Sequence, residues 1–211
     1  KALAEEFHDV TGAGLNDFLE LDALDSLFQN GQPNLDTDNP SKYLLYQDPL
    51  LGIFDRHIED LDTERYYQDL ADRLEICRKH APAYDTLFAF YHSLASTLAG
   101  KADLGVRLKK AYDAHDLSTL DTICEEVIPG IINDLSTTRL LREHLWMQDA
   151  KPFGYELLDI KLAGVIARLT STRYRLRYYI DGRVQRLEEL EADRLRSEER
   201  RVGKECRSRW S

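Results

Sequence analysis

Apolar residues recur every three or four positions along most of the chain from Thr63 onward. This is the period of a helix with one buried face. Four stripes can be traced: Tyr66, Leu70, Leu74 and Cys77; Tyr84, Leu87, Phe88, Tyr91, Leu94 and Leu98; Leu120, Ile123, Cys124, Val127, Ile128, Ile131, Ile132 and Leu135; and Leu158, Val165, Ile166 and Leu169. Four long helices with short connections predict an antiparallel bundle. No stretch has the pattern of a strand, so we expect an all-α fold.

Capping residues and helix breakers set the expected limits of the first two helices. Thr63 is typical of a helix start, and Pro82 follows the expected end of that helix. Gly100 and Gly105 interrupt the second stripe, so we expect a bend there. The helix is then expected to resume and to end near His115.

The other two long helices have their own signals. Ser118 is the predicted N-cap of the third helix, and Pro129 is predicted to kink it. The fourth helix is expected to begin near Tyr155 and to continue past Gly182 to Leu190.

The first 62 residues are less regular. A short helix is predicted over residues 2–8 and another from Asn16. Residues 29–42, QNGQPNLDTDNPSK, have the composition of a loop. The next stretch, YLLYQDPLLGIFDRHIEDLD, is broken by a proline and a glycine. It predicts a short helix, a kink and a second short helix.

The composition restricts the class of function. The chain has 211 residues, 43% of them hydrophobic and 31% charged, which suffices for one core in one or two domains. A formal net charge of −10 opposes nucleic-acid binding. We find neither an apolar run of about 18 residues nor a signal peptide, so we expect no membrane association. Cys77, Cys124 and Cys206 have no zinc or disulfide spacing, which favours a reducing, cytoplasmic setting.

Two carboxylates in the segment KPFGYELLDIKLAGVIARL form the first candidate for chemistry. Glu156 and Asp159 are three residues apart, which places them about 5 to 6 Å apart on one helical face. A retaining glycosidase needs a similar separation, but its two carboxyls approach the sugar from different sides. We therefore favour a structural role, with Glu156 at the helix N-terminus and Asp159 paired either with neighbours of Lys161 or with a facing arginine.

The sequence motifs give little support for a metal site or a cofactor site. The six histidines are scattered without the spacing of metal ligands: His8, His57, His80, His92, His115 and His144. The one E-x-x-H motif, Glu5 to His8, has no second copy, which a di-iron bundle would need. Cys77 and Cys124 lie on apolar stripes and are expected to be small core residues. We predict neither a metal site nor a cofactor.

Three segments resemble the C-terminal part of family 20 glycoside hydrolases, the β-N-acetylhexosaminidases. They are FHDVTGAGLNDFLELD (7–22), NPSKYLLYQDPLLGIFD (39–55) and KPFGYELLDIKLAGVIARL (151–169). In that family a (β/α)8 barrel is followed, in one subgroup, by a helical domain. The resemblance covers residues 1–195 and implies three parts: the last helical segment of the barrel (1–28), a junction loop with short helices (29–62) and the helical bundle (63–195).

The resemblance also implies an activity. Family members hydrolyse terminal N-acetylglucosamine or N-acetylgalactosamine by substrate-assisted catalysis, in which an Asp-Glu dipeptide at a strand end orients the acetamido group and protonates the leaving oxygen. This chain has no Asp-Glu dipeptide, and Glu59-Asp60 has the reverse order. We therefore assign no catalytic residue here and expect the pair upstream of Lys1. Whether this chain has any activity of its own stays open.

Other expected contacts are with the barrel of the same chain, with substrate and with a second subunit. Tyr43, Tyr46 and Asp48 could line the rim of the sugar site of the same subunit or of a partner subunit, but we favour a packed junction between domains for them. The resemblance also implies a homodimer, because family members with this domain pair through it. Phe90 and Tyr179 are candidate anchors of that homodimer. The alternative is that the helices only buttress the barrel. A rival hypothesis is a free-standing helical interaction module with no enzymatic parent.

The last sixteen residues, RSEERRVGKECRSRWS, have no apolar period. They resemble the translated read-through of a sequencing adapter, so we interpret residues 196–211 as foreign to the protein. The alternative is a basic tail that binds nucleic acid.

Overall fold

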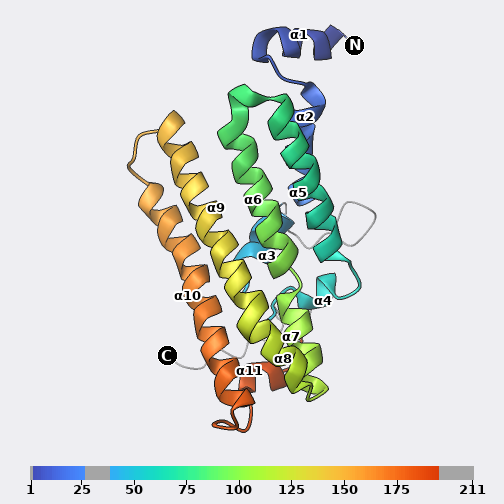
Figure 1. Cartoon of the computed structure of the whole chain (residues 1–211), viewed down its shortest axis with the longest axis vertical. Helices are drawn as coiled ribbons and strands as arrows, with labels where there is room; N and C mark the ends of the chain where they lie inside the picture. The colour runs from blue at the N-terminus through green and yellow to red at the C-terminus, as the bar shows by residue number, and fades with distance from the viewer. Residues whose placement is uncertain (1, 27–38, 195–211) are drawn as a thin grey trace, which may run out of the picture.

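The computed structural model describes residues 2–26 and 39–194, and all regular elements within these ranges are helical. Four long helices dominate: α5 (Thr63–His80), α6 (Asp85–Lys101), α9 (Ile128–Asp149) and α10 (Tyr155–Ile180). Figure 1 shows them side by side in the order α5, α6, α9 and α10, with each helix antiparallel to its neighbour. The predicted all-α bundle is confirmed.

Short elements fill the ends and one face of this row. Those before the bundle are α1 (Ala2–Thr11), α2 (Leu15–Leu19), the 3-10 helix η1 (Glu20–Asp25), α3 (Pro40–Tyr46) and α4 (Asp55–Ile58). Those within it are η2 (Pro82–Tyr84), α7 (Leu104–Asp113), α8 (Leu117–Thr122), the π-helical turn η3 (Ile123–Val127) and α11 (Glu188–Glu191). The predicted pair of short helices around a kink is present as α3 and α4. The loop predicted over 29–42 lies mostly outside the described residues, and α3 already begins at Pro40, because proline suits the first helical turn.

One hydrophobic core joins the leader (residues 2–26) to the bundle. Tyr67 is fully buried on α5, whereas Tyr66, which the stripe had predicted inside, is half-buried. Both hydroxyls donate to the leader, Tyr66 to the carbonyl oxygen of Ala23 at 2.5 Å and Tyr67 to that of Leu24 at 3.3 Å. The leader is therefore fixed against α5.

The contact between α6 and α9 is close and partly polar. The buried hydroxyl of Thr138 lies 2.7 Å from that of Ser93 and 2.9 Å from that of Thr97. One turn further on, a Cβ added at Gly100 would lie 3.0 Å from Ile131. Gly100 therefore serves packing between the helices, and the helix break that it was expected to cause falls just after it, where α6 ends.

The cap predicted at Ser118 is wrong. Asp116 is the N-cap of α8, because its carboxylate accepts a hydrogen bond from the backbone N–H of Thr119 at 3.0 Å and another from the Thr119 hydroxyl at 2.6 Å. The preceding residue, His115, has a φ of +52°, so the chain turns there before α8 can begin.

Pro129 sits just after a wide turn of helix. Proline has no N–H and clashes with the carbonyl four residues earlier, here that of Glu125. The turn η3 relieves this conflict, since the N–H of Ile128 donates to the carbonyl of Ile123, five residues back. The helix therefore continues from α8 through η3 into α9, with the extra residue absorbed at the turn.

The fourth helix is shorter than predicted. It ends at Ile180, and Gly182 adopts a φ of +71°. The N–H of Gly182 donates to the carbonyl of Tyr179 at 3.0 Å, and the next N–H donates to that of Tyr178 at 2.9 Å. Glycine in this left-handed conformation stops a helix and satisfies its last carbonyls.

Candidate functional site

A buried lysine holds the segment from α3 to α4 against the end of α6. Lys101 is 1% exposed, and its Nζ donates to the carbonyl oxygens of Leu44 at 3.0 Å and Gln47 at 2.9 Å. These carbonyls lie at the C-terminal end of α3, where helix carbonyls lack intrahelical partners and carry partial negative charge. Lys101 therefore caps α3 from inside the protein.

Burial changes the chemistry of this lysine. Desolvation lowers the pKa of Lys101 from its ordinary 10.5 to about 7, because a low-dielectric interior disfavours the charged form. The negative charges of Asp48 and Asp55 oppose this shift without cancelling it. A lysine with such a pKa can exchange a proton near neutrality, but its partners here are two backbone carbonyls, which suit a structural tie.

Gln47 completes the tie between the two segments. Its amide nitrogen donates to the carbonyl of Ala102 at 3.1 Å, and its amide oxygen accepts from the backbone N–H of Phe54 at 3.1 Å. The side chain is buried, so both polar ends need these partners. We call the set of Leu44, Gln47, Lys101 and Ala102 the junction.

The three residues predicted at a sugar rim all lie beside the junction. Tyr43 is 38% exposed and its ring packs on Phe54 at 5.2 Å, while Tyr46 is half-buried and desolvation raises its pKa. Asp48 accepts from the N–H of Leu50 at 2.9 Å and from Nε of Arg168 on α10 at 2.6 Å. The carboxylate of Asp48 is thus engaged in holding α10 to this turn. A role of these residues at a sugar site stays a prediction.

A second buried charge lies next to the junction. Asp55, at the start of α4, pairs with Arg194 at 3.3 Å, and both side chains are buried. A Cβ added at Gly105 would lie 2.6 Å from both carboxylate oxygens of Asp55. Gly105, expected only to bend a helix, is therefore the residue that lets α7 approach this carboxylate.

A groove of about 530 Å³ opens beside this pair and is lined mainly by charged side chains. Its rim is internally paired, since Arg56 contacts Glu59 at 3.1 Å and Lys109 contacts Asp113 at 2.6 Å. Each of these pairs lies within one helical segment, the first at α4 and the second in α7, so the charges of the rim are largely satisfied locally.

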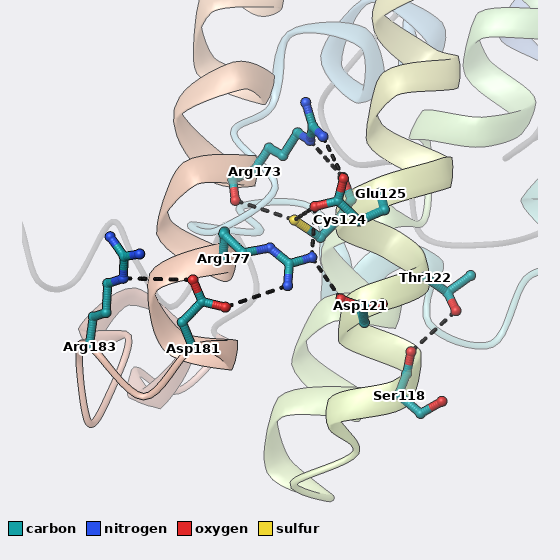
Figure 2. Close-up of polar contacts among 9 residues, drawn as sticks. All are labelled: Ser118, Asp121, Thr122, Cys124, Glu125, Arg173, Arg177, Asp181 and Arg183. Atoms are coloured by element: carbon teal, nitrogen blue, oxygen red, sulfur yellow. Dashed lines mark hydrogen bonds and ion pairs between the residues drawn. The ribbon is translucent and has the colours of Figure 1, made fainter.

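Arginines of α10 form a network with the α8–η3 segment (Figure 2). Arg173 donates to the carboxylate of Glu125 at 2.5 Å and to the carbonyl of Cys124 at 3.0 Å. Arg177 reaches Asp121 at 2.6 Å and Glu125 at 2.7 Å. These two guanidiniums hold the pKa of Glu125 down at about 2, because they stabilise its charged form.

The two cysteines that the structure describes are buried, as predicted. Burial raises the pKa of Cys77 to about 11, and it also raises that of Cys124. Thiols with raised pKa values are poor nucleophiles at neutral pH. Cys124 lies within the arginine network, with Sγ 3.4 Å from a Glu125 oxygen (Figure 2).

The carboxylates of Glu156 and Asp159 have structural partners. Glu156 accepts from the backbone N–H of Gly154 at 2.7 Å, just before α10. Asp159 pairs with Arg139 of α9 at 2.5 Å. This agrees with the structural role that the sequence favoured for both residues.

The two candidate dimer anchors lie far apart. Phe90, near the start of α6, is half-buried under Arg142, whose guanidinium carbon lies 5.5 Å from the ring centre. Tyr179 lies in the last turn of α10, with its ring 5.0 Å from that of Tyr112. Neither residue has a contact that decides its role in a dimer.

The described part of the chain contains no group of three or more His, Cys, Asp or Glu residues arranged to hold a metal ion. In residues 2–26 and 39–194, no helix has the length and apolar character needed to cross a membrane.

The family model of the glycoside hydrolase 20C C-terminal domain matches residues 16–208. The chain belongs to this family. No match was found among curated proteins. The 20C domain match covers the bundle, the junction and part of the leader, and it extends into the tail interpreted as foreign, which lies outside the described residues.

Sequence reasoning missed the residues that build the junction of this 20C domain. Lys101 stands alone between apolar stretches, STLAGKADLGV, and a lone lysine within a buried stripe is a signal of an internal polar contact. Gln47 in the junction and Asp55 beside it carry no comparable signal, because their partners Ala102 and Arg194 are distant in sequence and are set by tertiary packing.

Proposed function

We propose that this chain is the C-terminal domain of a β-N-acetylhexosaminidase, which removes terminal N-acetylglucosamine or N-acetylgalactosamine in cytoplasmic carbohydrate metabolism. The family match over residues 16–208 carries this proposal. The parent would use substrate-assisted catalysis in a preceding barrel, since this chain has no Asp-Glu dipeptide. Glu156 and Asp159 are occupied by contacts within the domain and leave the catalytic role to the barrel.

The domain's own task in this proposal is structural. The leader, bonded to α5 through Tyr66 and Tyr67, would transmit the position of the barrel to the bundle. The junction around Lys101 would keep Tyr43, Tyr46 and Asp48 in a fixed place beside the substrate rim. Substrate would then meet this domain only at that rim.

We also propose that the domain holds the parent enzyme as a homodimer. Phe90 and Tyr179 are only half-buried, and each lies in an aromatic cluster of the kind that anchors protein interfaces. A two-fold interface would bring the same patch of both subunits together.

Activity assays test the hydrolase proposal. The 211-residue chain should release no chromophore from an aryl N-acetylglucosaminide, whereas the gene product that includes the preceding barrel should do so. Replacing the Asp-Glu pair of that barrel by Asn-Gln should abolish turnover. Turnover by the short chain that survives repurification and disappears in Glu156→Gln would overturn the proposal. A start codon directly before Lys1 would favour the free-standing module.

Sedimentation equilibrium of the full-length parent tests the dimer. We expect a dimer at micromolar concentration and its weakening by Phe90→Glu or Tyr179→Glu. A monomer would contradict the dimer role, and a dimer indifferent to both substitutions would reject these anchors.

A further inference from the structure

A groove of about 500 Å³ lies between α6 and α9, at the end of the row where α6 begins and α9 ends (Figure 1). Aromatic side chains come from both helices, with Phe90 and Tyr91 on α6 and Trp146 on α9. Two side chains of opposite charge on α9, Arg142 and Asp149, also line it. We call these five residues the aromatic groove.

The rings of the aromatic groove are held in place by contacts within the domain. Nε1 of Trp146 donates to the carbonyl oxygen of Lys151 at 2.8 Å, and the indole ring lies 5.9 Å from that of the buried Tyr155. Phe90 and Tyr91 meet edge to face, with ring centres 5.2 Å apart. A ligand would therefore meet a surface that is already ordered, so that little side-chain entropy is lost on binding.

Arg142 is held by the same rings and keeps its hydrogen-bond donors. Its guanidinium carbon lies 5.5 Å from the ring centre of Phe90 and 5.5 Å from that of Trp146. Aromatic rings attract a cation but accept no conventional hydrogen bond from it, so the N–H groups of Arg142 remain available. No carboxylate of the described residues forms an ion pair with this arginine.

The charges of the groove favour a neutral ligand. Asp149 is exposed at the end of α9, and in residues 2–26 and 39–194 it has no cationic partner. An anion would be attracted by Arg142 and repelled by Asp149, whereas a cation would experience the reverse. Hydroxyl groups both donate and accept hydrogen bonds, so a neutral ligand with several hydroxyl groups can satisfy both residues.

Sugars combine such hydroxyl groups with apolar C–H patches on the faces of their rings. A C–H patch of this kind packs well against aromatic side chains, which supply a large and rigid apolar surface. The volume of the groove also lies within the range of about 300 to 1,000 Å³ that small-molecule sites have. The combination of aromatic rings, an unpaired donor and an unpaired acceptor therefore fits a carbohydrate.

We propose that the aromatic groove binds a neutral sugar unit, which packs against the aromatic rings and forms hydrogen bonds through its hydroxyl groups with Arg142 and Asp149. This inference goes beyond the proposed hydrolase, because here the helical domain itself holds a glycan and breaks no bond. Phe90 supports Arg142 from below in this arrangement.

Tryptophan fluorescence tests binding in the 211-residue chain, because Trp210→Phe leaves Trp146 as its one tryptophan. At pH 6, N-acetylglucosamine is neutral, glucosamine is cationic and glucuronic acid is anionic. We expect a saturable change with N-acetylglucosamine at a Kd of about 10 mM, and binding at least about threefold weaker for the two charged sugars. No saturable change up to about 100 mM, or equally tight binding of a charged sugar, would overturn the proposal.

Substitutions in the Trp210→Phe background locate the site. Arg142→Met should weaken N-acetylglucosamine binding at least about tenfold, because it removes the donors. Asp149→Asn should let glucuronic acid bind more tightly, because it removes the repulsion. Arg183→Met is the matched control, since its guanidinium carbon also lies 5.4 Å from a ring centre, that of Tyr178, but outside the groove.

Circular dichroism should give the same helical content for all of these variants. Binding of N-acetylglucosamine that is unaffected by Arg142→Met, together with binding of glucuronic acid that is unaffected by Asp149→Asn, would reject the groove as the site.

Sedimentation equilibrium separates this inference from the dimer proposed above. A dimer formed through Phe90 would cover the groove, so saturating N-acetylglucosamine should dissociate it. A dimer that persists with sugar bound would reject Phe90 as an anchor and keep the sugar site, whereas a dimer that persists and binds no sugar would overturn the site. Neither result changes the hydrolase proposal, which is tested by the activity of the barrel-containing parent.

Discussion

The Nζ of Lys101 lies 3.0 Å from the carbonyl oxygen of Leu44, fifty-seven residues away in sequence. This bond links the end of α6 to the end of α3 across the core. The lysine is buried, so its charge is costly unless it is compensated. The junction of this 20C domain therefore depends on a titratable group, which makes its stability sensitive to pH.

Lys101→Met should change the pH dependence of stability. In the unfolded chain the lysine titrates near its ordinary 10.5, but in the folded chain its pKa is about 7. Between these values the unfolded state binds one more proton, so the free energy of unfolding of the wild type should rise with pH by up to about 1.4 kcal/mol per unit. Below about pH 7 both states are protonated and this contribution is constant.

Urea denaturation at several pH values from 6 to 10 measures this effect. The variant should lack the rise that the lysine causes. Lys42→Met, which removes an exposed lysine of α3, should behave like the wild type. Parallel curves for wild type and Lys101→Met would contradict the prediction.

Gly105→Ala should destabilise the protein by about 1 to 3 kcal/mol, because the new methyl group would lie 2.6 Å from the carboxylate oxygens of Asp55. Gly130→Ala is the matched control in α9, where no atom lies within 4 Å of the added group. That change should be neutral or stabilising by up to about 1 kcal/mol, since alanine favours a helix over glycine. Urea unfolding compares them, and equal effects would refute the role given to Gly105.

Glu125→Gln should lower the stability of the folded protein at neutral pH. In acid the substitution should have little effect. The pKa of Glu125 falls from its ordinary 4.5 to about 2 because Arg173 and Arg177 donate hydrogen bonds to it. The stabilisation is therefore present above about pH 4.5 and disappears as pH falls toward 2. Salt should also weaken it, because these groups are exposed.

Thermal unfolding of wild type and Glu125→Gln at pH 7, 5 and 3 checks this prediction. Glu126→Gln serves as control, since Glu126 is an exposed neighbour in the same turn. A difference between wild type and Glu125→Gln that does not shrink toward pH 3 would argue against the arginine contacts.

A chain that stops after Leu195 should keep its helical content and thermal midpoint. The remaining sixteen residues have no apolar stripe and so can bury little area. A chain that stops after Gln185 should be clearly less stable, because it also loses Leu187 and Leu190, which are buried in the core. Circular dichroism melts compare the three chains, and a drop of several degrees in the first truncation would show that the tail packs.

The long helices could be predicted because their information is local. Thr63 opens α5 and Pro82 follows its end, as expected, and the period of apolar residues located the buried faces. The exact ends of other helices were harder to predict. Asp116 was missed as a cap and Gly182 as a stop, since both residue types also occur at other positions and only the backbone geometry separates the cases.

The candidate sites could likewise be predicted only where the information is local in the sequence. The structural role of Glu156 and Asp159 could be inferred from their place on one helical face. A facing arginine was one of two expected kinds of partner for Asp159, and the structure identifies it as Arg139. The junction could not be predicted, because Gln47 and Lys101 are far apart in sequence and meet only when α3 lies on α6.

The sequence by itself determined that this protein is helical, where the buried face of each long helix lies, and that the chain contains no Asp-Glu dipeptide, because periodicity and motifs are properties of neighbouring residues. The tertiary structure decided the order of the helices in the row and the buried partners of Lys101 and Asp55. It also decided that Arg142 and Trp146 of α9 share a groove with Phe90 of α6. These relationships join segments distant along the chain, so they exist only once the helices have packed against one another.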